Sequence, residues 1–121
     1  MSLKGLLQSF RDAARGIGYT FKSEQNFRLQ ILVAAVAVVL MLAIPLRNWE
    51  QILVLLLILM VLSMELLNTA VEKFSDLLVP RLHQQISVIK DVMAAAVFIT
   101  SLGAAVIGVM IFWPYLADWI K

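Results

Sequence analysis

Three stretches of the chain carry no Asp, Glu, Lys or Arg, and their lengths constrain the fold more than any other feature of the sequence. A helix of about 20 apolar residues spans a bilayer. The stretches 29–46 and 92–117 are therefore sufficient to cross a membrane by themselves, whereas 51–64 needs the more polar residues that follow it. We predict three transmembrane helices, at residues 29–46, 51–72 and 91–114.

The composition of the chain also indicates a membrane protein. Of its 121 residues, 62% are hydrophobic and 15% are charged, and the mean hydropathy is +0.92. Soluble domains are about half apolar and about a quarter charged. We therefore expect a single all-α integral membrane domain over residues 1–121. The chain has no cysteine, which excludes disulfide bonds and thiolate chemistry.

The basic residues are distributed unevenly about the three apolar stretches. Most of them precede the first stretch or lie between the second and the third, at Lys4, Arg11, Arg15, Lys22, Arg28, Lys73, Arg81 and Lys90. Only Arg47 and Lys121 lie in the remaining segments. Because loops rich in Lys and Arg stay in the cytoplasm, we expect the N-terminus and the second loop to be cytoplasmic and the C-terminus to be outside.

The first residues predict a helix on the membrane surface. Over residues 2–22, apolar side chains recur near helical period on one side, with charged and amide side chains on the other. Such a helix suits the inner leaflet, although a helix that merely caps the bundle fits the same pattern. We expect Gly16 and Gly18 to break this helix and Ser23 to cap the next one.

Four polar residues interrupt the apolar pattern at the end of the second stretch. Glu65, Asn68, Glu72 and Asp76 follow one another at spacings of three or four, and on a helix they fall within an arc of about 80°. If the second span begins near Gln51, Glu65 lies about 21 Å along it, inside a hydrocarbon layer of about 30 Å. Glu72 follows about 10 Å further on, close to the cytoplasmic boundary.

A carboxylate inside a membrane is costly unless it is paired, hydrated or protonated, and such residues usually serve a function. The plainer alternative is that Glu65 hydrogen-bonds across helices while the other acids form a solvated helix end. A stripe of four polar residues suits this alternative less well than one isolated acid would.

The stripe suits a reaction between a lipid alcohol and a water-borne triphosphate. A lipid alcohol presents its hydroxyl near the headgroups, where Glu65 could act as the general base. Glu72 together with Glu24 could hold the Mg²⁺ that bridges the phosphates. Lys90 would add positive charge for the transferred phosphoryl group, and Asp91 would orient it or remain a helix-start carboxylate. The sequence has no phosphate-binding glycine loop, so ATP binding would depend on metal, basic side chains and helix ends.

The segment E-L-L-N-T-A-V-E-K-F-S-D at residues 65–76 closely resembles the signature of the prokaryotic diacylglycerol kinase family, which includes diacylglycerol kinase and undecaprenol kinase. The resemblance is supported by E-Q-N-F-R at 24–28, by the P-x-x-H run that ends at His83, and by K-D followed by small residues at 90–96. It spans most of the chain, from the surface helix through the third apolar stretch.

The resemblance implies a homotrimer of three-span subunits in the bacterial cytoplasmic (inner) membrane, with active sites shared between neighbours. Each site would transfer the γ-phosphoryl group of magnesium ATP to a lipid hydroxyl at the cytoplasmic interface. Carried over residue by residue, the family pattern makes Glu65 the general base and Glu24 and Glu72 the metal ligands. The supporting polar groups of catalysis and nucleotide binding would be Asn68, Lys90, Asp91, Arg11, Arg15, Lys22 and Asp76.

Two residues depart from the family pattern. Ser75 stands where valine is usual, and Gln30 stands where an acid is common in the diacylglycerol branch. Neither is the expected base or a metal ligand, so both bear on the lipid rather than on the reaction. Undecaprenol and diacylglycerol stay open, with Gln30 and the single Glu of 24–28 tilting the interpretation slightly towards undecaprenol.

Two other classes of function also stay open on the sequence. A small proton-coupled exporter could use Glu65 as its carrier acid and would not need Glu24, Glu72 or Lys90. A non-catalytic membrane subunit would need none of the carboxylates. No nucleic-acid partner is expected. His83 is expected to lie in the cytoplasmic loop as an ordinary hydrogen-bonding residue.

Overall fold

The computed structural model describes residues 2–121, and within this range the secondary structure is entirely helical. The helices are α1 (Leu3–Ser23), α2 (Gln25–Ala43), α3 (Asn48–Asp76) and α4 (His83–Ile120). The last three are long and apolar enough to cross a membrane. The prediction of an all-α chain with three such helices is confirmed. Each predicted membrane segment overlaps one of them, and the position of the segments in a bilayer stays a prediction.

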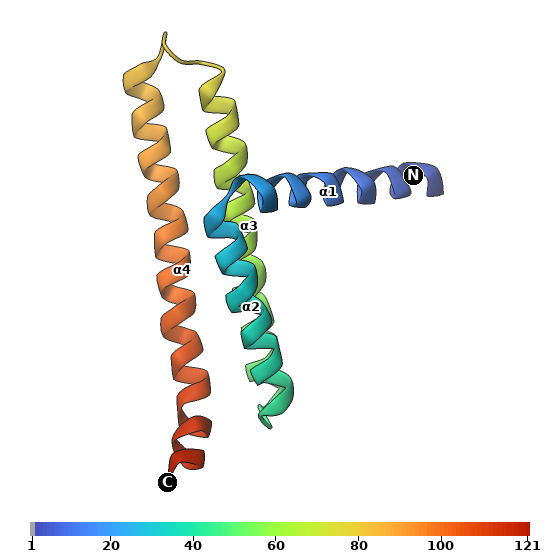
Figure 1. Ribbon diagram of the computed structural model, residues 1–121, viewed down its shortest axis with the longest axis vertical. Helices are drawn as coiled ribbons and strands as arrows, with labels where there is room; N and C mark the ends of the chain where they lie inside the picture. Colours follow the sequence, from blue (N-terminus) through green and yellow to red (C-terminus); the bar gives the residue numbers. More distant parts are fainter. Residues whose placement is uncertain (1) are drawn as a thin grey trace.

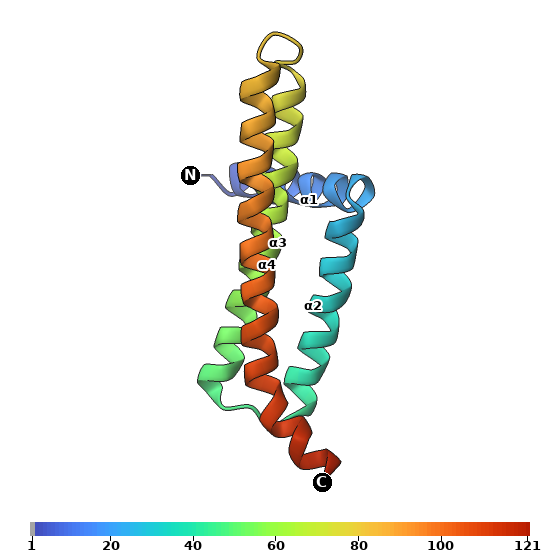
Figure 2. The same cartoon turned by 90° about the vertical axis from the view of Figure 1, so that its left-hand side faces the viewer.

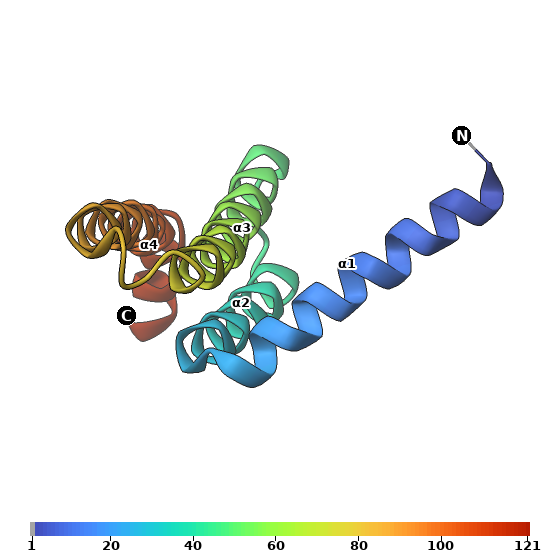
Figure 3. The same ribbon diagram turned by 90° about the horizontal axis from the view of Figure 1, so that it is seen from above.

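The three apolar helices lie side by side, and α1 runs crosswise to them (Figure 1). Helix α3 packs against α4, α2 and the end of α1. Seen from above, α1 projects away from the bundle formed by the other helices (Figure 3). Helices α3 and α4 continue beyond the level of α1 before a short connection joins them (Figure 2). Of the three long helices, only α3 and α4 therefore extend past α1, towards the connection that joins them.

The apolar core lies at the end of the bundle far from α1. Its buried residues come from the end of α2, the following turn, α3 and α4, and are Met41, Ile44, Leu46, Val54, Ile111 and Phe112. Pro45 lies between two of them and cannot continue a helix, so α2 ends at Ala43. Next to this core the carboxylate of Glu50 is buried and accepts hydrogen bonds from the Arg47 amide, at 2.9 Å, and from the Tyr115 hydroxyl.

Helix α1 runs without interruption through both of its central glycines. The predicted break at Gly16 and Gly18 is wrong. Glycine in a helix interior costs about 1 kcal/mol relative to alanine, which weakens a helix but does not end it. The Gly16 carbonyl also accepts a hydrogen bond from the Thr20 hydroxyl at 3.0 Å. The helix ends at Ser23, and Glu24, in extended conformation, takes the N-cap position of α2 that was expected for Ser23.

Helix α4 is longer than the apolar stretch from which it was predicted. It begins at His83, so the expectation that His83 lies in a loop is wrong. Lys90 and Asp91 therefore lie two turns inside the helix rather than at its start. Pro114 lies within α4, which continues to Ile120, and the helix axis bends near its C-terminal end (Figure 2). Proline bends a helix here because it removes one backbone hydrogen bond and crowds the preceding turn.

Candidate active site

The polar stripe on α3 begins with the most deeply buried acid of the described chain. Glu65 is 1% exposed. Its carboxylate faces α2, where the side-chain amide of Gln30 donates a hydrogen bond to Oε2 at 3.5 Å. The Glu65 backbone carbonyl accepts a second bond from the Thr69 hydroxyl at 3.0 Å. Glu65 is thus held between two helices rather than exposed at the outside of the bundle.

The junction between α1 and α2 brings a second acid to the same stripe. Arg28 fixes this junction, because its guanidinium donates to the carbonyls of Phe21 and Lys22 at 2.7 and 3.1 Å at the end of α1. Glu24 lies in the junction, and its carboxyl is close enough to that of Glu72 for the two to interact electrostatically. Burial and then the negative charge of Glu72 raise the pKa of Glu24 above its ordinary value, while the Lys73 ammonium opposes the rise.

Asn68 joins the two levels of the stripe. Its side-chain amide donates to Oε1 of Glu72 at 3.4 Å, and it lies between Glu65 and Glu72 along α3. The structure therefore brings together four of the predicted site residues, Glu24, Glu65, Asn68 and Glu72, and adds Gln30 to them.

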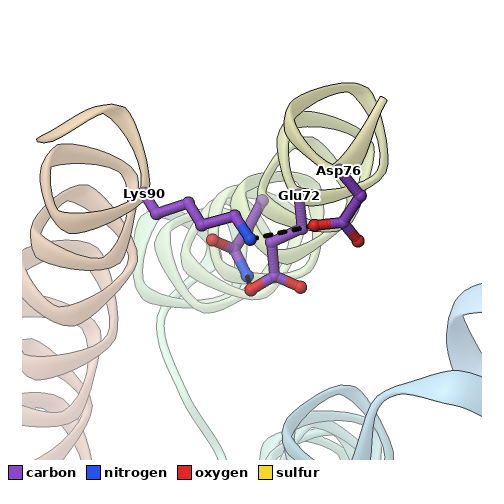
Figure 4. A network of polar contacts seen from close by, with 4 residues as sticks. Glu72, Asp76 and Lys90 are labelled. Carbon is purple, nitrogen blue, oxygen red and sulfur yellow. Dashed lines mark hydrogen bonds and ion pairs between the residues drawn. The ribbon is translucent and has the colours of Figure 1, made fainter. Parts of the chain in front are cut away.

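The end of the stripe nearest the connection between α3 and α4 meets α4. The Lys90 ammonium reaches across from α4 and pairs with Oδ1 of Asp76 at 3.0 Å, just beyond Glu72 (Figure 4). A cavity of about 450 Å³ lies next to this pair and is also lined by Asp91 and His83. Lys90, Asp91 and Asp76 thus form one group at the far end of the stripe from Glu65.

A larger cavity, of about 940 Å³, runs along the bundle between α2, α3 and α4. At the end nearest α1 it is lined by the polar side chains of Asn26, Gln30, Glu65, Asn68 and Glu72. Over the rest of its length almost all of the lining side chains are apolar, down to Phe112 and Trp113. The cavity therefore has a short polar end and a long apolar remainder.

Three of the predicted nucleotide-binding residues lie away from these groups. Arg11 and Arg15 are on the exposed part of α1 that projects from the bundle, where Arg15 pairs with Asp12 at 3.7 Å (Figure 3). Lys22 is exposed at the end of α1. In a single chain, over residues 2–121, these three side chains lie apart from the polar stripe of α3.

The sequence profile of the family described as prokaryotic diacylglycerol kinase matches residues 11–112, most of the chain. The chain belongs to this family. The kinase is 34% identical over 114 residues to an undecaprenol kinase of Bacillus subtilis, and the alignment covers 94% of this chain and 93% of the relative. It is 36% identical over 115 residues to a diacylglycerol kinase of Synechocystis sp., covering 92% of this chain and 64% of the relative.

A diacylglycerol kinase of Haemophilus influenzae is 32% identical to the kinase over 97 residues, which cover 80% of this chain and 82% of the relative. The polar stripe at residues 65–76 lies inside residues 11–112, the region that the family profile matches. The family and its three apolar helices make the protein a membrane lipid kinase, a transferase of lipid metabolism.

The donor set of the kinase fits one Mg²⁺ that is also bound by phosphate. Mg²⁺ prefers oxygen ligands and is commonly held by one or two carboxylates together with substrate phosphates and water. Glu24 and Glu72 supply two neighbouring carboxylates that interact electrostatically. Among residues 2–121 there is no cluster of three or more acidic or histidine side chains that could hold a metal by itself.

Sequence reasoning missed two contacts of the kinase at this site. Gln30 departs from the family pattern, but its partnership with Glu65 was not predicted. Its signal was available, since it is the one polar side chain in the apolar stretch 29–46. The second contact is Lys73, whose ammonium lies 5.6 Å from the centre of the Tyr19 ring and ties α3 to α1. No spacing rule in the sequence connects these two residues.

Proposed function

We propose that the kinase transfers the γ-phosphoryl group of ATP to the hydroxyl of a membrane lipid alcohol at the cytoplasmic surface, giving a lipid phosphate. The observation that carries the proposal is the place of Glu65. It is a buried carboxylate at the polar end of a cavity that is otherwise apolar. An oily chain suits the apolar part of the cavity, which would leave its hydroxyl beside the carboxylate.

The level of α1 supports this placement in the membrane. One side of α1 carries Leu3, Leu6, Leu7 and Phe10, all exposed in the single chain, and such a helix lies on a bilayer with its apolar side buried among the lipids. Glu24 is at the end of α1 and contacts Glu72. Glu65 lies seven residues before Glu72 in α3, which puts it about 10 Å deeper than Glu72 in the proposed arrangement. By the distribution of Lys and Arg, α1 is on the cytoplasmic surface.

In the proposed reaction Glu65 acts as the general base. Its carboxylate takes the proton of the lipid hydroxyl as the hydroxyl oxygen forms a bond to the γ-phosphorus. The bond between the γ-phosphorus and the bridging oxygen breaks, and ADP leaves with that oxygen. Gln30 orients the carboxylate through its amide hydrogen bond. The apolar lining over most of the cavity would limit the access of water to a lipid bound there, which would favour transfer to the lipid over hydrolysis.

The nucleotide would approach from the water above α1, where α3 and α4 extend. Glu24 and Glu72 would hold Mg²⁺, which neutralises the phosphate oxygens when it is bound with ATP. Asn68 holds the Glu72 carboxylate by its 3.4 Å hydrogen bond. Lys90, now paired with Asp76, would turn to the transferred phosphoryl group, and Asp91 would orient it.

The kinase is proposed to work as a homotrimer with sites shared between subunits. Support comes from α1, which carries Arg11 and Arg15 away from the stripe of its own chain (Figure 3). A projecting helix can reach a neighbouring subunit, where its basic side chains and Lys22 would contribute to nucleotide binding. We propose a bacterial cytoplasmic membrane as the location of this assembly, which agrees with the family membership.

The lipid is proposed to be undecaprenol or diacylglycerol, the substrates after which the relatives are named. Both offer a primary hydroxyl on an apolar chain. A side-by-side assay with both lipids, purified kinase, ATP and Mg²⁺ tests the proposal. We expect ATP consumption and a lipid phosphate only when a lipid alcohol is present. Indifference to ATP together with proton release driven by an exported solute would contradict the proposal and favour a proton-coupled exporter.

A further inference from the structure

Gln30 lies in the second turn of α2 and lines the polar end of the larger cavity. It is the one polar side chain in an otherwise apolar stretch of the sequence. Its position next to Glu65, on a different helix, gives it access to whatever group Glu65 acts on. The proposed reaction uses Gln30 only to orient Glu65.

The Gln30 amide is incompletely paired in the structure. Its nitrogen donates to Glu65 at 3.5 Å, at the long end of the hydrogen-bond range. Its oxygen, Oε1, is buried and has no hydrogen-bond partner within residues 2–121, the one side-chain atom of which this is true. Leaving a buried acceptor without a donor is unfavourable, so in the native protein such an atom is expected to be paired by a ligand or an ordered water.

None of the side chains described in residues 2–121 donates to this oxygen in the structure. The carboxylate of Glu65 only accepts hydrogen bonds when it is ionised. The amide of Asn68 is directed to Glu72, and Asn26 is exposed one turn nearer to the water. A hydroxyl that enters the polar end of the cavity would bring the donor that the protein lacks.

We infer that Gln30 is a lipid-binding residue whose side-chain oxygen accepts a hydrogen bond from the hydroxyl that is to be phosphorylated. The inference rests on the proposed function and deepens it. The last torsion of a glutamine side chain is soft, so Oε1 can turn towards the cavity that the residue lines. The hydroxyl then lies between two acceptors, Gln30 and Glu65, and its proton is shared by both until the carboxylate takes it.

This hydrogen bond distinguishes substrate from product. The alcohol has a proton to donate to Gln30, whereas the same oxygen in the lipid phosphate is esterified and has none. Gln30 therefore binds the alcohol more tightly than the product at this position, which favours product release. An ester carbonyl or an ether oxygen cannot replace the hydroxyl, because both only accept hydrogen bonds.

Binding in the absence of ATP tests the inference without turnover. The probes are geranylgeraniol and dioctanoylglycerol in lipid nanodiscs, each compared with an analogue in which hydrogen replaces the hydroxyl. For the lipid that binds, we expect the preference for the alcohol to fall about tenfold in Gln30→Leu and in Gln30→Met, as loss of one buried hydrogen bond predicts. Gln51→Leu, a matched change at the other end of the bundle, should leave the preference unchanged.

Steady-state kinetics provide a second readout that a merely structural role would not move. In Gln30→Met the lipid KM should rise about tenfold, while the ATP KM stays as in the wild type. If both Gln30 variants keep the full preference for the alcohol while the wild type phosphorylates it, the inference is wrong and the proposed function stands. If the wild type neither binds nor phosphorylates either alcohol, the proposed function fails and the inference fails with it.

Discussion

At the scale of single residues, the proposed Mg²⁺ site depends on the closeness of the Glu24 and Glu72 carboxyl groups. Two neighbouring carboxylates repel each other when both are ionised, and burial adds to the cost. Burial and the Glu72 charge raise the pKa of Glu24. Such a pair destabilises the folded state unless a bound cation or a proton reduces the repulsion. Functional sites commonly reduce the stability of a protein in this way.

Glu24→Gln is therefore expected to stabilise the protein while lowering Mg²⁺-dependent activity. Because the folded-state pKa of Glu24 is raised, the folded protein binds its proton more tightly than the unfolded chain, and stability falls as pH rises through that range. The variant should have a higher Tm than the wild type at neutral pH in EDTA, and the difference should shrink as pH is lowered. Asp12→Asn, an exposed change on α1, is the control. A lower Tm for Glu24→Gln in EDTA would contradict the cation site.

The residues of the site were predictable to different degrees. The spacing of Glu65, Asn68 and Glu72 is enough to place them on one face of a helix, because helical geometry alone fixes that relation. Glu24 and Glu72 were expected to share a metal ion, and the family resemblance supported that expectation, but no spacing rule predicts a contact between such distant segments. The unpaired oxygen of Gln30 could not be predicted, because hydrogen-bond satisfaction depends on how α2 packs against α3.

At the scale of elements, Gly16 and Gly18 of α1 allow the effect of glycine on helix stability to be measured. Each of the two central glycines has open space around the position where a side chain would begin, with nothing within 4 Å of an added Cβ. Replacing either with alanine therefore adds helix propensity and creates no clash.

Gly16→Ala and Gly18→Ala should each stabilise α1 by roughly 0.5–1 kcal/mol. Slower amide hydrogen exchange in residues 12–22 would show the effect. Gly5→Ala is the matched control, because its new Cβ would lie 3.2 Å from the Ser2 hydroxyl that caps the helix, so it should gain less. Faster exchange in both central variants would mean that α1 is interrupted at the glycines, as the sequence alone suggests.

The opposite end of the bundle is held by a polar contact between elements. Glu50 at the start of α3 is buried and accepts a hydrogen bond from Tyr115 of α4. Tyr115→Phe removes this donor and leaves the carboxylate with the Arg47 amide as its remaining partner, so Tm should fall by a few degrees. Tyr19→Phe, on the exposed surface of α1, should change Tm less. Equal effects of the two changes would show that the contact contributes nothing.

The helices themselves were predictable from apolar length, but their ends were less so. Pro45 ends α2 two residues before it, at Ala43, as proline chemistry requires. His83, in contrast, begins α4 although the charged and amide residues around it favour a loop. Polar residues at the end of a membrane helix do not stop it, because water can solvate an extended helix as well as it solvates a loop.

At the scale of the whole molecule, helix lengths support the proposal that the site lies at a membrane boundary. Helix α4 has 38 residues and is about 57 Å long, well beyond the roughly 30 Å of a hydrocarbon layer. The excess lies with the end of α3 on the side of α1 (Figure 1). If α1 lies on the membrane surface, as we propose, the two helices carry Asp76 and Lys90 into water while Glu65 stays below the surface.

The proposed orientation can be measured because the chain has no cysteine. Asn48→Cys, at the start of α3, and Gln84→Cys, at the start of α4, each introduce a single thiol at an exposed position. Because α3 and α4 run antiparallel, the two positions lie at opposite ends of the bundle (Figure 1). In intact cells a membrane-impermeant maleimide should label Asn48→Cys only, and permeabilised cells should label both variants. Labelling of Gln84→Cys alone in intact cells would invert the orientation and move the site to the outer surface.

The most direct measurement of the role of the buried acid is lipid-phosphate formation by Glu65→Gln, compared with Glu50→Gln. Both changes remove a buried carboxylate from α3, but only one lies at the polar end of the cavity. Glu65→Gln should lower kcat by about a hundredfold or more with the subunit assembly intact, whereas Glu50→Gln should keep kcat near that of the wild type. Near wild-type turnover by Glu65→Gln would contradict the assignment of this residue as the base.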